Sequence, residues 1–131
     1  MWGLADPNTS RYPRDVPPKD LVAASARPLL LGLLAKRESY GYELVHRVGE
    51  LSGGALEWSE GMLYPVLHRL EREGLITAEW RVAPETGRKR KYYQLSAEGK
   101  QAARSEREAW LSVHAVLERV WLGMKGPRVT P

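Results

Sequence analysis

The chain has 131 residues, 43% hydrophobic and 27% charged, which fits one globular domain with a single core. Twenty Lys and Arg against sixteen Asp and Glu leave a formal net charge of +4, which permits a polyanionic partner without requiring one. Cysteine is absent, which excludes disulfides and thiol catalysis, and no apolar run reaches the roughly 20 residues of a membrane span, so we expect a cytoplasmic protein with no membrane partner.

The amino-terminal part predicts an arm followed by a first helix. Residues 1–19 contain four prolines, which stop helices and strands before they propagate, so this segment should be a flexible arm. Asp20 can cap a helix whose leucines recur at helical spacing and which should end near Arg37. Pro28 lacks the backbone N–H that a helix interior needs, so we expect a break or kink near Arg27.

Two further helices are predicted by apolar residues at helical spacing. One repeat runs over residues 42–51 and the other over residues 63–70. Ser59 can cap the later helix and Gly74 can end it, although Pro65 lies inside it against its propensity.

The remaining chain predicts a hairpin and a long terminal helix. Residues 75–82 and 91–95 carry β-branched and aromatic positions on either side of a tip that contains Pro and Gly. Ser96 can cap a helix that follows. The order predicts a mainly α (α+β) winged helix-turn-helix with a two-stranded β-wing and one further C-terminal helix. The expected segments are a flexible arm (1–19), the winged helix-turn-helix domain (20–96), the terminal helix (97–122) and a flexible tail (123–131).

Two features of this pattern indicate nucleic-acid binding. The third helix would hold Glu60, Tyr64, His68 and Arg72 on the face opposite its inward leucines, free to enter a major groove. Four consecutive cations, residues 88–91, would lie at the rim of the second strand immediately after the flexible tip, and they suit a phosphate backbone. Each feature alone has a plainer interpretation, a solvated helix face and a charged edge that discourages strand pairing.

Three sequence segments resemble the PadR family of bacterial transcriptional regulators. They are GYEL at residues 41–44, GMLYPVLHRLEREGL at residues 61–75 and GRKRKYYQLSAEG at residues 87–99. With the leucine-rich first helix, the resemblance covers about residues 21–122. Relatives often carry Thr or Ser where Met62 stands, so a hydroxyl contact typical of the family is in doubt here.

The resemblance implies a sequence-specific DNA-binding regulator, a repressor in its simplest form, and neither an enzyme nor a holder of a metal or cofactor. It places Pro65 inside the recognition helix. The DNA-contacting residues expected from position and resemblance are Tyr42, Ser59, Glu60, Met62, Tyr64, His68, Arg69, Arg88, Lys89, Arg90 and Lys91.

The resemblance implies that the terminal helix is a C-terminal dimerisation helix that joins two copies into a homodimer, and the residue spacing supports this. Ala103, Trp110 and Leu117 are spaced by seven, a seam that a lone helix would leave exposed, although the same stripe could pack within its own chain. Such a dimer would bind a pseudo-palindromic double-stranded operator. The resemblance further implies an interface in which Trp110 and Val113 stack a small planar aromatic effector, although a tryptophan there is more often plain packing. The expected dimer-interface residues are Leu30, Ala103, Trp110, Val113, Leu117, Val120 and Trp121.

Two competing functions are weighed against this one. No nucleophile elbow, phosphate loop or metal-binding histidine pair accompanies the Ser, His and Asp residues, which disfavours a hydrolase. A winged helix could instead present the same faces to another polypeptide as a protein–protein interaction module.

Overall fold

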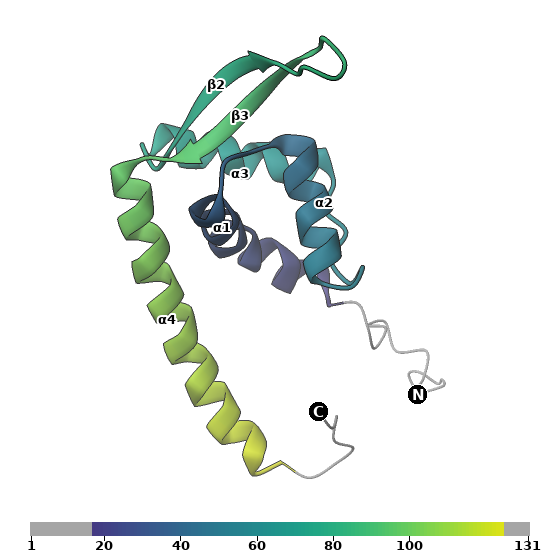
Figure 1. The fold of residues 1–131 in the computed structure, drawn as a ribbon. Helices are drawn as coiled ribbons and strands as arrows, with labels where there is room; N and C mark the ends of the chain where they lie inside the picture. Colours follow the sequence, from purple (N-terminus) through teal and green to yellow (C-terminus); the bar gives the residue numbers. More distant parts are fainter. Residues whose placement is uncertain (1–16, 125–131) are drawn as a thin grey trace.

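The computed structural model describes residues 17–124 and forms a small helical body from which one long helix extends (Figure 1). The elements in chain order are α1 (Lys19–Lys36), β1 (Ser39–Tyr40), α2 (Gly41–Leu51), α3 (Glu60–Arg72), β2 (Ile76–Val82), β3 (Lys89–Leu95) and α4 (Ala97–Leu122). Most of the arm expected over residues 1–19 and of the tail expected over 123–131 lies outside the described residues, and Lys19 already belongs to α1.

Helix α1 runs without interruption through Pro28, so a break near Arg27 is wrong, whereas a kink there stays a prediction. The proline leaves the Ala24 carbonyl without its helical donor. The helix nevertheless buries Leu30, Leu31 and other apolar side chains in the core on either side of this point. Burying each such side chain is worth about 2 kcal/mol, which offsets the loss of one backbone hydrogen bond.

The core lies between α1, α2 and α3 and is closed by one face of the sheet. Leu44 and Val48 of α2 meet Leu63, Leu67 and other side chains in one buried cluster. The expected cap is confirmed, because the Met62 N–H donates to Ser59 Oγ at 3.2 Å at the start of α3. Pro65 lies inside α3, as the family resemblance implied.

The expected two-stranded wing is formed by β2 and β3, and the short strand β1 extends it to a three-stranded antiparallel sheet. Its order is β1-β3-β2, with Ser39 opposite Tyr93 and Tyr40 opposite Tyr92. Strands β2 and β3 pair along their whole length, from Ile76 opposite Leu95 to Val82 opposite Lys89. The two-residue strand β1 therefore ties the wing to the segment between α1 and α2.

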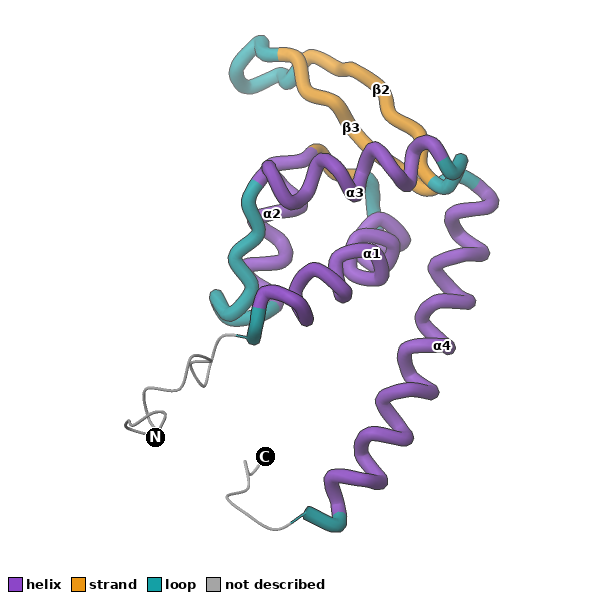
Figure 2. Tube along the Cα trace, turned by 180° about the vertical axis from the view of Figure 1, so that it is seen from behind, coloured by secondary structure: helices purple, strands orange, loops and turns teal. Residues whose placement is uncertain are grey.

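Helix α4 has the expected bounds and is anchored to the body only at its beginning. The Gly99 N–H donates to Ser96 Oγ at 3.0 Å, and that hydroxyl donates to the Gly74 carbonyl at 2.6 Å. A Cβ on Gly99 would lie 1.9 Å from the Leu75 carbonyl oxygen, so only glycine permits this approach. Figures 1 and 2 show α4 passing α1 and then continuing away from the body.

Candidate nucleic-acid interface

The outer ridge of α3 differs in part from the face that the sequence predicts. His68 and Arg72 are exposed there, as expected, together with Gly61 and Pro65. These positions lie opposite the buried leucines, whereas Tyr64 lies on the flank of the helix. The surface that α3 offers to a groove is therefore centred on His68, with Glu60 and Arg69 exposed beside it.

Tyr64 is only half exposed because its ring packs against the core. A Cβ on Gly41 would lie 2.4 Å from the Tyr64 hydroxyl oxygen, so the phenol reaches the first residue of α2. Burial and the nearby Glu60 carboxylate both raise the pKa of Tyr64. The tyrosine thus joins α3 to α2 and closes the base of the interface, in addition to any contact it makes with DNA.

Two other expected contacts also serve the fold. The Ser59 hydroxyl accepts the Met62 N–H as the cap of α3, and the Met62 side chain is half buried against the core. Tyr42, by contrast, is 66% exposed in the first turn of α2 and is free to meet a ligand.

Three of the four cations of the wing lie on β3, and they divide between its two faces. Side chains alternate along a strand, so Lys89 and Lys91 share the face of buried Tyr93, and Arg90 lies on the face of Tyr92. The Lys91 Nζ atom lies 5.6 Å from the Tyr93 ring centre, in agreement with this division. Arg88 precedes the strand at the wing tip and is exposed.

Helix α3, the start of α2 and the wing enclose one open hollow of about 900 Å³. Tyr64 and His68 line it from α3, and Tyr42 lines it from α2. The wing contributes Trp80 and all four residues from Arg88 to Lys91. Aromatic rings and positive charge therefore converge on one side of the molecule, which is the chemistry that a nucleic-acid backbone requires.

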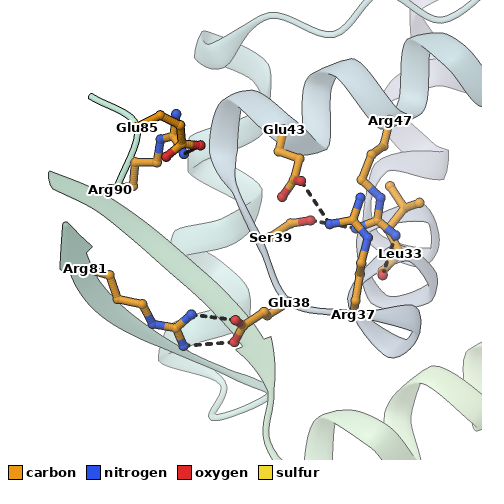
Figure 3. A network of polar contacts seen from close by, with 9 residues as sticks. All are labelled: Leu33, Arg37, Glu38, Ser39, Glu43, Arg47, Arg81, Glu85 and Arg90. Carbon is orange, nitrogen blue, oxygen red and sulfur yellow. Dashed lines mark hydrogen bonds and ion pairs between the residues drawn. The ribbon is translucent and has the colours of Figure 1, made fainter. Parts of the chain in front are cut away.

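An ion-pair network on the other face of the sheet fixes the wing to the body (Figure 3). The Arg81 guanidinium donates two hydrogen bonds to the Glu38 carboxylate, of which Nη2 to Oε1 measures 2.9 Å, and one to Glu79. It also lies 4.6 Å from the centre of the Tyr92 ring. Arg81 lowers the pKa of Glu38, and the two carboxylates raise the pKa of Arg81.

A second network sets the position of α2 (Figure 3). Arg47 donates from Nη1 to Ser39 Oγ at 2.7 Å and from Nη2 to the Leu33 carbonyl at 3.1 Å. Arg37 and Glu43 form an ion pair of 2.9 Å beside it. Ser39 is fully buried, and the Arg47 bond gives its hydroxyl oxygen a donor. These bonds connect the end of α1 and strand β1 to the helix that carries Tyr42.

Beyond its first ten residues, α4 leaves an apolar surface uncovered. Arg27 binds Glu106 at 2.8 Å and Glu73 at 3.0 Å, which holds α4 against α1 and the end of α3. Every α4 residue after Glu106 is exposed. The large exposed apolar residues on this part of the helix are Trp110, Leu111, Val113, Val116, Leu117, Val120, Trp121 and Leu122.

The expectation that Leu30 lies in the dimer interface is wrong, because Leu30 is 0% exposed in the core of a single chain. The side of α1 that faces α4 carries Pro28, Leu29 and Gly32 instead. Together with Ala103 and Trp110 of α4 and their neighbours, these residues line an open, mainly apolar groove of about 700 Å³.

Sequence reasoning missed Trp80, Arg81 and Glu38. The alternation of Ile76, Ala78, Trp80 and Val82 could have indicated that Trp80 continues the core-facing row of the strand. No local signal pairs Arg81 with Glu38, since the two are 43 residues apart.

The described residues contain neither a candidate metal-binding cluster nor a helix that could span a membrane. Between residues 17 and 124, no group of three or more His, Asp and Glu side chains could hold a metal ion. No helix in the same part of the chain is long and apolar enough to cross a bilayer.

Several known proteins are similar to this chain in sequence and in fold. Residues 30–105 match the model of the transcriptional regulator PadR-like family. The transcriptional regulator Rv3488 of Mycobacterium tuberculosis is 36% identical over 91 residues, which cover 70% of this chain and 80% of that protein. A PadR-like transcriptional regulator of Bacillus cereus is 26% identical, with a TM-score of 0.71 over 81% of this chain and 100% of that structure. A transcriptional regulator of Clostridium thermocellum is 25% identical, also with a TM-score of 0.71, over 79% of this chain and 97% of its own.

Proposed function

This chain belongs to the PadR-like family of transcriptional regulators, so it is a DNA-binding regulator and not an enzyme, and we propose that it acts as a homodimeric repressor in the cytoplasm. In this proposal residues 20–96 bind DNA, and residues 97–122 join the two copies.

The assignment of the DNA-binding face rests on one observation: α3 and the wing line the same hollow. His68 and Arg69 are exposed on the helix, and Arg88 and Lys89 are exposed on the wing. Phosphate contacts give affinity and register, whereas contacts to base edges give sequence preference. The wing cations therefore anchor the duplex, and the α3 ridge around His68 discriminates among sequences.

The uncovered face of α4 supports the dimer. Trp110, Leu117 and Val120 are large, apolar and exposed in a single chain, an arrangement that marks association surfaces in soluble proteins. A second copy of the helix would cover them around a two-fold axis. Two recognition helices would then enter successive major grooves about 34 Å apart, which requires a pseudo-palindromic operator.

The groove between α1 and α4 supports an effector site beside the dimer axis. It is mainly apolar and is lined by Trp110, whose ring could stack on a planar aromatic compound. Val113 lies almost one turn further along α4 and is also exposed. Such a compound would release DNA only by favouring another spacing of the two recognition helices.

The salt dependence of binding tests the proposed function. With a selected operator duplex, affinity should fall roughly 10³-fold or more between 50 and 200 mM salt if the dimer touches about six to ten phosphates. Association with a protein partner through the same faces, the competing function, need not show this slope. An affinity for duplex DNA that stays constant across this range would contradict the proposal.

Two substitutions separate the proposed roles. Arg88→Ala should weaken binding to every duplex and lower the salt slope by about 1, whereas His68→Ala should mainly change the preference among operators. Tyr64→Ala is a poor probe because it also removes packing against Gly41. If both variants changed only overall affinity, the assignment of α3 to sequence preference would be wrong.

The dimer and the effector have their own measurements. Leu117→Asp should sediment as a monomer and bind a full operator weakly, because one protomer reaches only one half-site. Planar aromatic compounds should change the intrinsic fluorescence of the protein but not that of Trp110→Ala. Identical fluorescence titrations of the two proteins would end the effector proposal.

A further inference from the structure

We propose that the two faces of the wing have different tasks: its inner face holds one DNA strand, with Lys89 and Lys91 on phosphates and Trp80 on a sugar, while Arg90 on its outer face holds the wing in place. This inference rests on the proposed function. The inference deepens the proposed function by assigning each cation of β3 to one role and by adding a tryptophan to the DNA contacts.

The register of the hairpin defines the inner face. Trp80 is paired with Lys91, and Val82 is paired with Lys89. Directly paired residues in an antiparallel ladder point to the same side, so these four side chains share one face. That face is the continuation of the one on which Tyr93 and Ala78 pack against the core.

At these positions the inner face extends beyond the core, and none of the described residues, 17–124, covers it. Trp80 is 63% exposed and Val82 is 60% exposed, although strand residues of this size are normally buried. Within residues 17–124, neither Lys89 nor Lys91 forms an ion pair. Two apolar surfaces flanked by two unpaired cations remain available to a ligand.

The outer face, in contrast, has its charges already engaged. Arg81 and Arg90 are directly paired across the two strands, and without carboxylates they would repel each other. Arg81 binds Glu38 and Glu79, and the Arg90 Nη1 atom lies 3.7 Å from the Glu85 carboxylate. The Arg90 guanidinium also stacks on the Tyr40 ring at 4.3 Å, so it links the wing to strand β1.

On the inner face, each lysine of β3 lies beside an apolar residue of β2, which fits the chemistry of a DNA strand. A deoxyribose ring adjoins each phosphate, so an apolar side chain can pack on a sugar while the lysine beside it meets the adjacent phosphate. Across the hollow, His68 of α3 lines the same space together with Trp80, Lys89 and Lys91. Arg90 also lines the hollow, but its guanidinium is already engaged there by the Tyr40 ring and the Glu85 carboxylate. A strand lying there would be held between the recognition helix and the wing.

Four variants of the full-length protein test this division, each measured by fluorescence anisotropy with the same selected operator at several salt concentrations. Lys89→Ala and Lys91→Ala should each make the negative slope of log affinity against log salt shallower by about 0.9, because each removes one phosphate contact. The matched control Arg90→Ala removes the same formal charge from the neighbouring position and should leave the slope unchanged. Trp80→Ala should weaken binding roughly fivefold to tenfold with the slope unchanged, because the lost contact is apolar.

Two further measurements separate contact from folding. Thermal unfolding should show a larger fall in Tm for Arg90→Ala than for either lysine variant, since the arginine contacts both Tyr40 and Glu85, whereas Lys91 lies only 5.6 Å from the Tyr93 ring centre. Trp80→Phe should restore most of the affinity that Trp80→Ala loses, because the smaller ring still covers part of a sugar.

The outcomes distinguish this inference from the proposed function. A wild-type protein whose binding to duplex DNA shows no salt slope would overturn both. A normal wild-type slope that Arg90→Ala reduces and the two lysine variants do not would overturn only the division of the wing. Binding by Trp80→Ala at wild-type affinity would remove the tryptophan from the DNA contacts.

Discussion

The body of the molecule and the free part of α4 use similar apolar residues in opposite ways. In the body, the large apolar side chains of α1, α2 and α3 meet in one cluster, in which Leu30, Leu67 and others are fully buried. In α4, the only buried residue is Gly99, and the leucines, valines and tryptophans after Glu106 are all exposed. The body can therefore be stable as a single chain, whereas α4 needs another surface to bury its apolar face.

The body and α4 meet over a small contact at the start of α4, which we call the joint. Gly99 and Ser96 fix the start of α4 under the turn between α3 and β2, and Arg27 adds a pair of carboxylate contacts. A short, well-defined joint sets the direction of α4 without covering it. The orientation of the two recognition helices in a dimer would then be set by this joint and by the α4 contact together.

The largest expected effect separates a buried leucine from an exposed one. Leu67→Ala should lower the free energy of unfolding by about 3 kcal/mol at any protein concentration, because it leaves a cavity in the body. Leu117→Ala should change it by less than about 0.5 kcal/mol at low concentration and should mainly reduce the concentration dependence of Tm. Urea unfolding at two protein concentrations measures both. A large loss for Leu117→Ala at the lower concentration would mean that α4 packs within its own chain.

The next effect concerns the joint. Gly99→Ala should cost about 2 kcal/mol or more, because the new methyl group would meet the rigid Leu75 carbonyl. Gly49→Ala in α2 is the matched control: nothing lies within 4 Å of the new group, and helix propensity should raise stability by up to about 1 kcal/mol. Equal effects of the two substitutions would contradict the tight approach at the joint.

A smaller effect is expected from the ion pairs that cross the joint. Arg27→Ala should lower the free energy of unfolding by about 1 kcal/mol, since its contacts with Glu73 and Glu106 are only partly buried. The loss should shrink in 1 M salt, which screens exposed charges. Arg119→Ala, on the exposed part of α4, serves as the control and should change stability by less than about 0.5 kcal/mol. A loss that is independent of salt would indicate that Arg27 acts through packing.

The smallest effect tests burial within the body itself. The Tyr93 hydroxyl is buried without a hydrogen-bond partner, so Tyr93→Phe should be neutral or stabilise the protein by up to about 1 kcal/mol at pH 7. Burial raises the pKa of Tyr93 to about 12. The unfolded chain loses this proton first, near pH 10, so the wild type should lose stability as the pH rises from about 10 to 12. Tyr93→Phe should lose less over the same interval, as measured by urea unfolding at each pH. An equal loss in both proteins would show that other groups cause the alkaline effect.

The sequence by itself determined the order and most bounds of the elements, because these depend on local quantities. Helical spacing of apolar residues, the capping hydroxyls of Ser59 and Ser96, and the stop at Gly74 act within a few residues of each other. The resemblance carried by residues 61–75 and 87–99 gave the family, and it placed Pro65 inside a helix where propensity alone argued against it.

Only the tertiary structure decided which surfaces meet. Strand β1 is two residues long, too short for a periodic signal, and it forms only because Tyr92 and Tyr93 lie beside it. Tyr64 is half buried because Gly41 comes within reach, and Leu30 is unavailable to a partner because α1 turns it into the core. Periodicity assigns a side chain to a face, but the neighbour on that face comes from a distant part of the chain. For the same reason, Lys89, Arg90 and Lys91 could be assigned to the two faces of β3 only after the register of the hairpin was known.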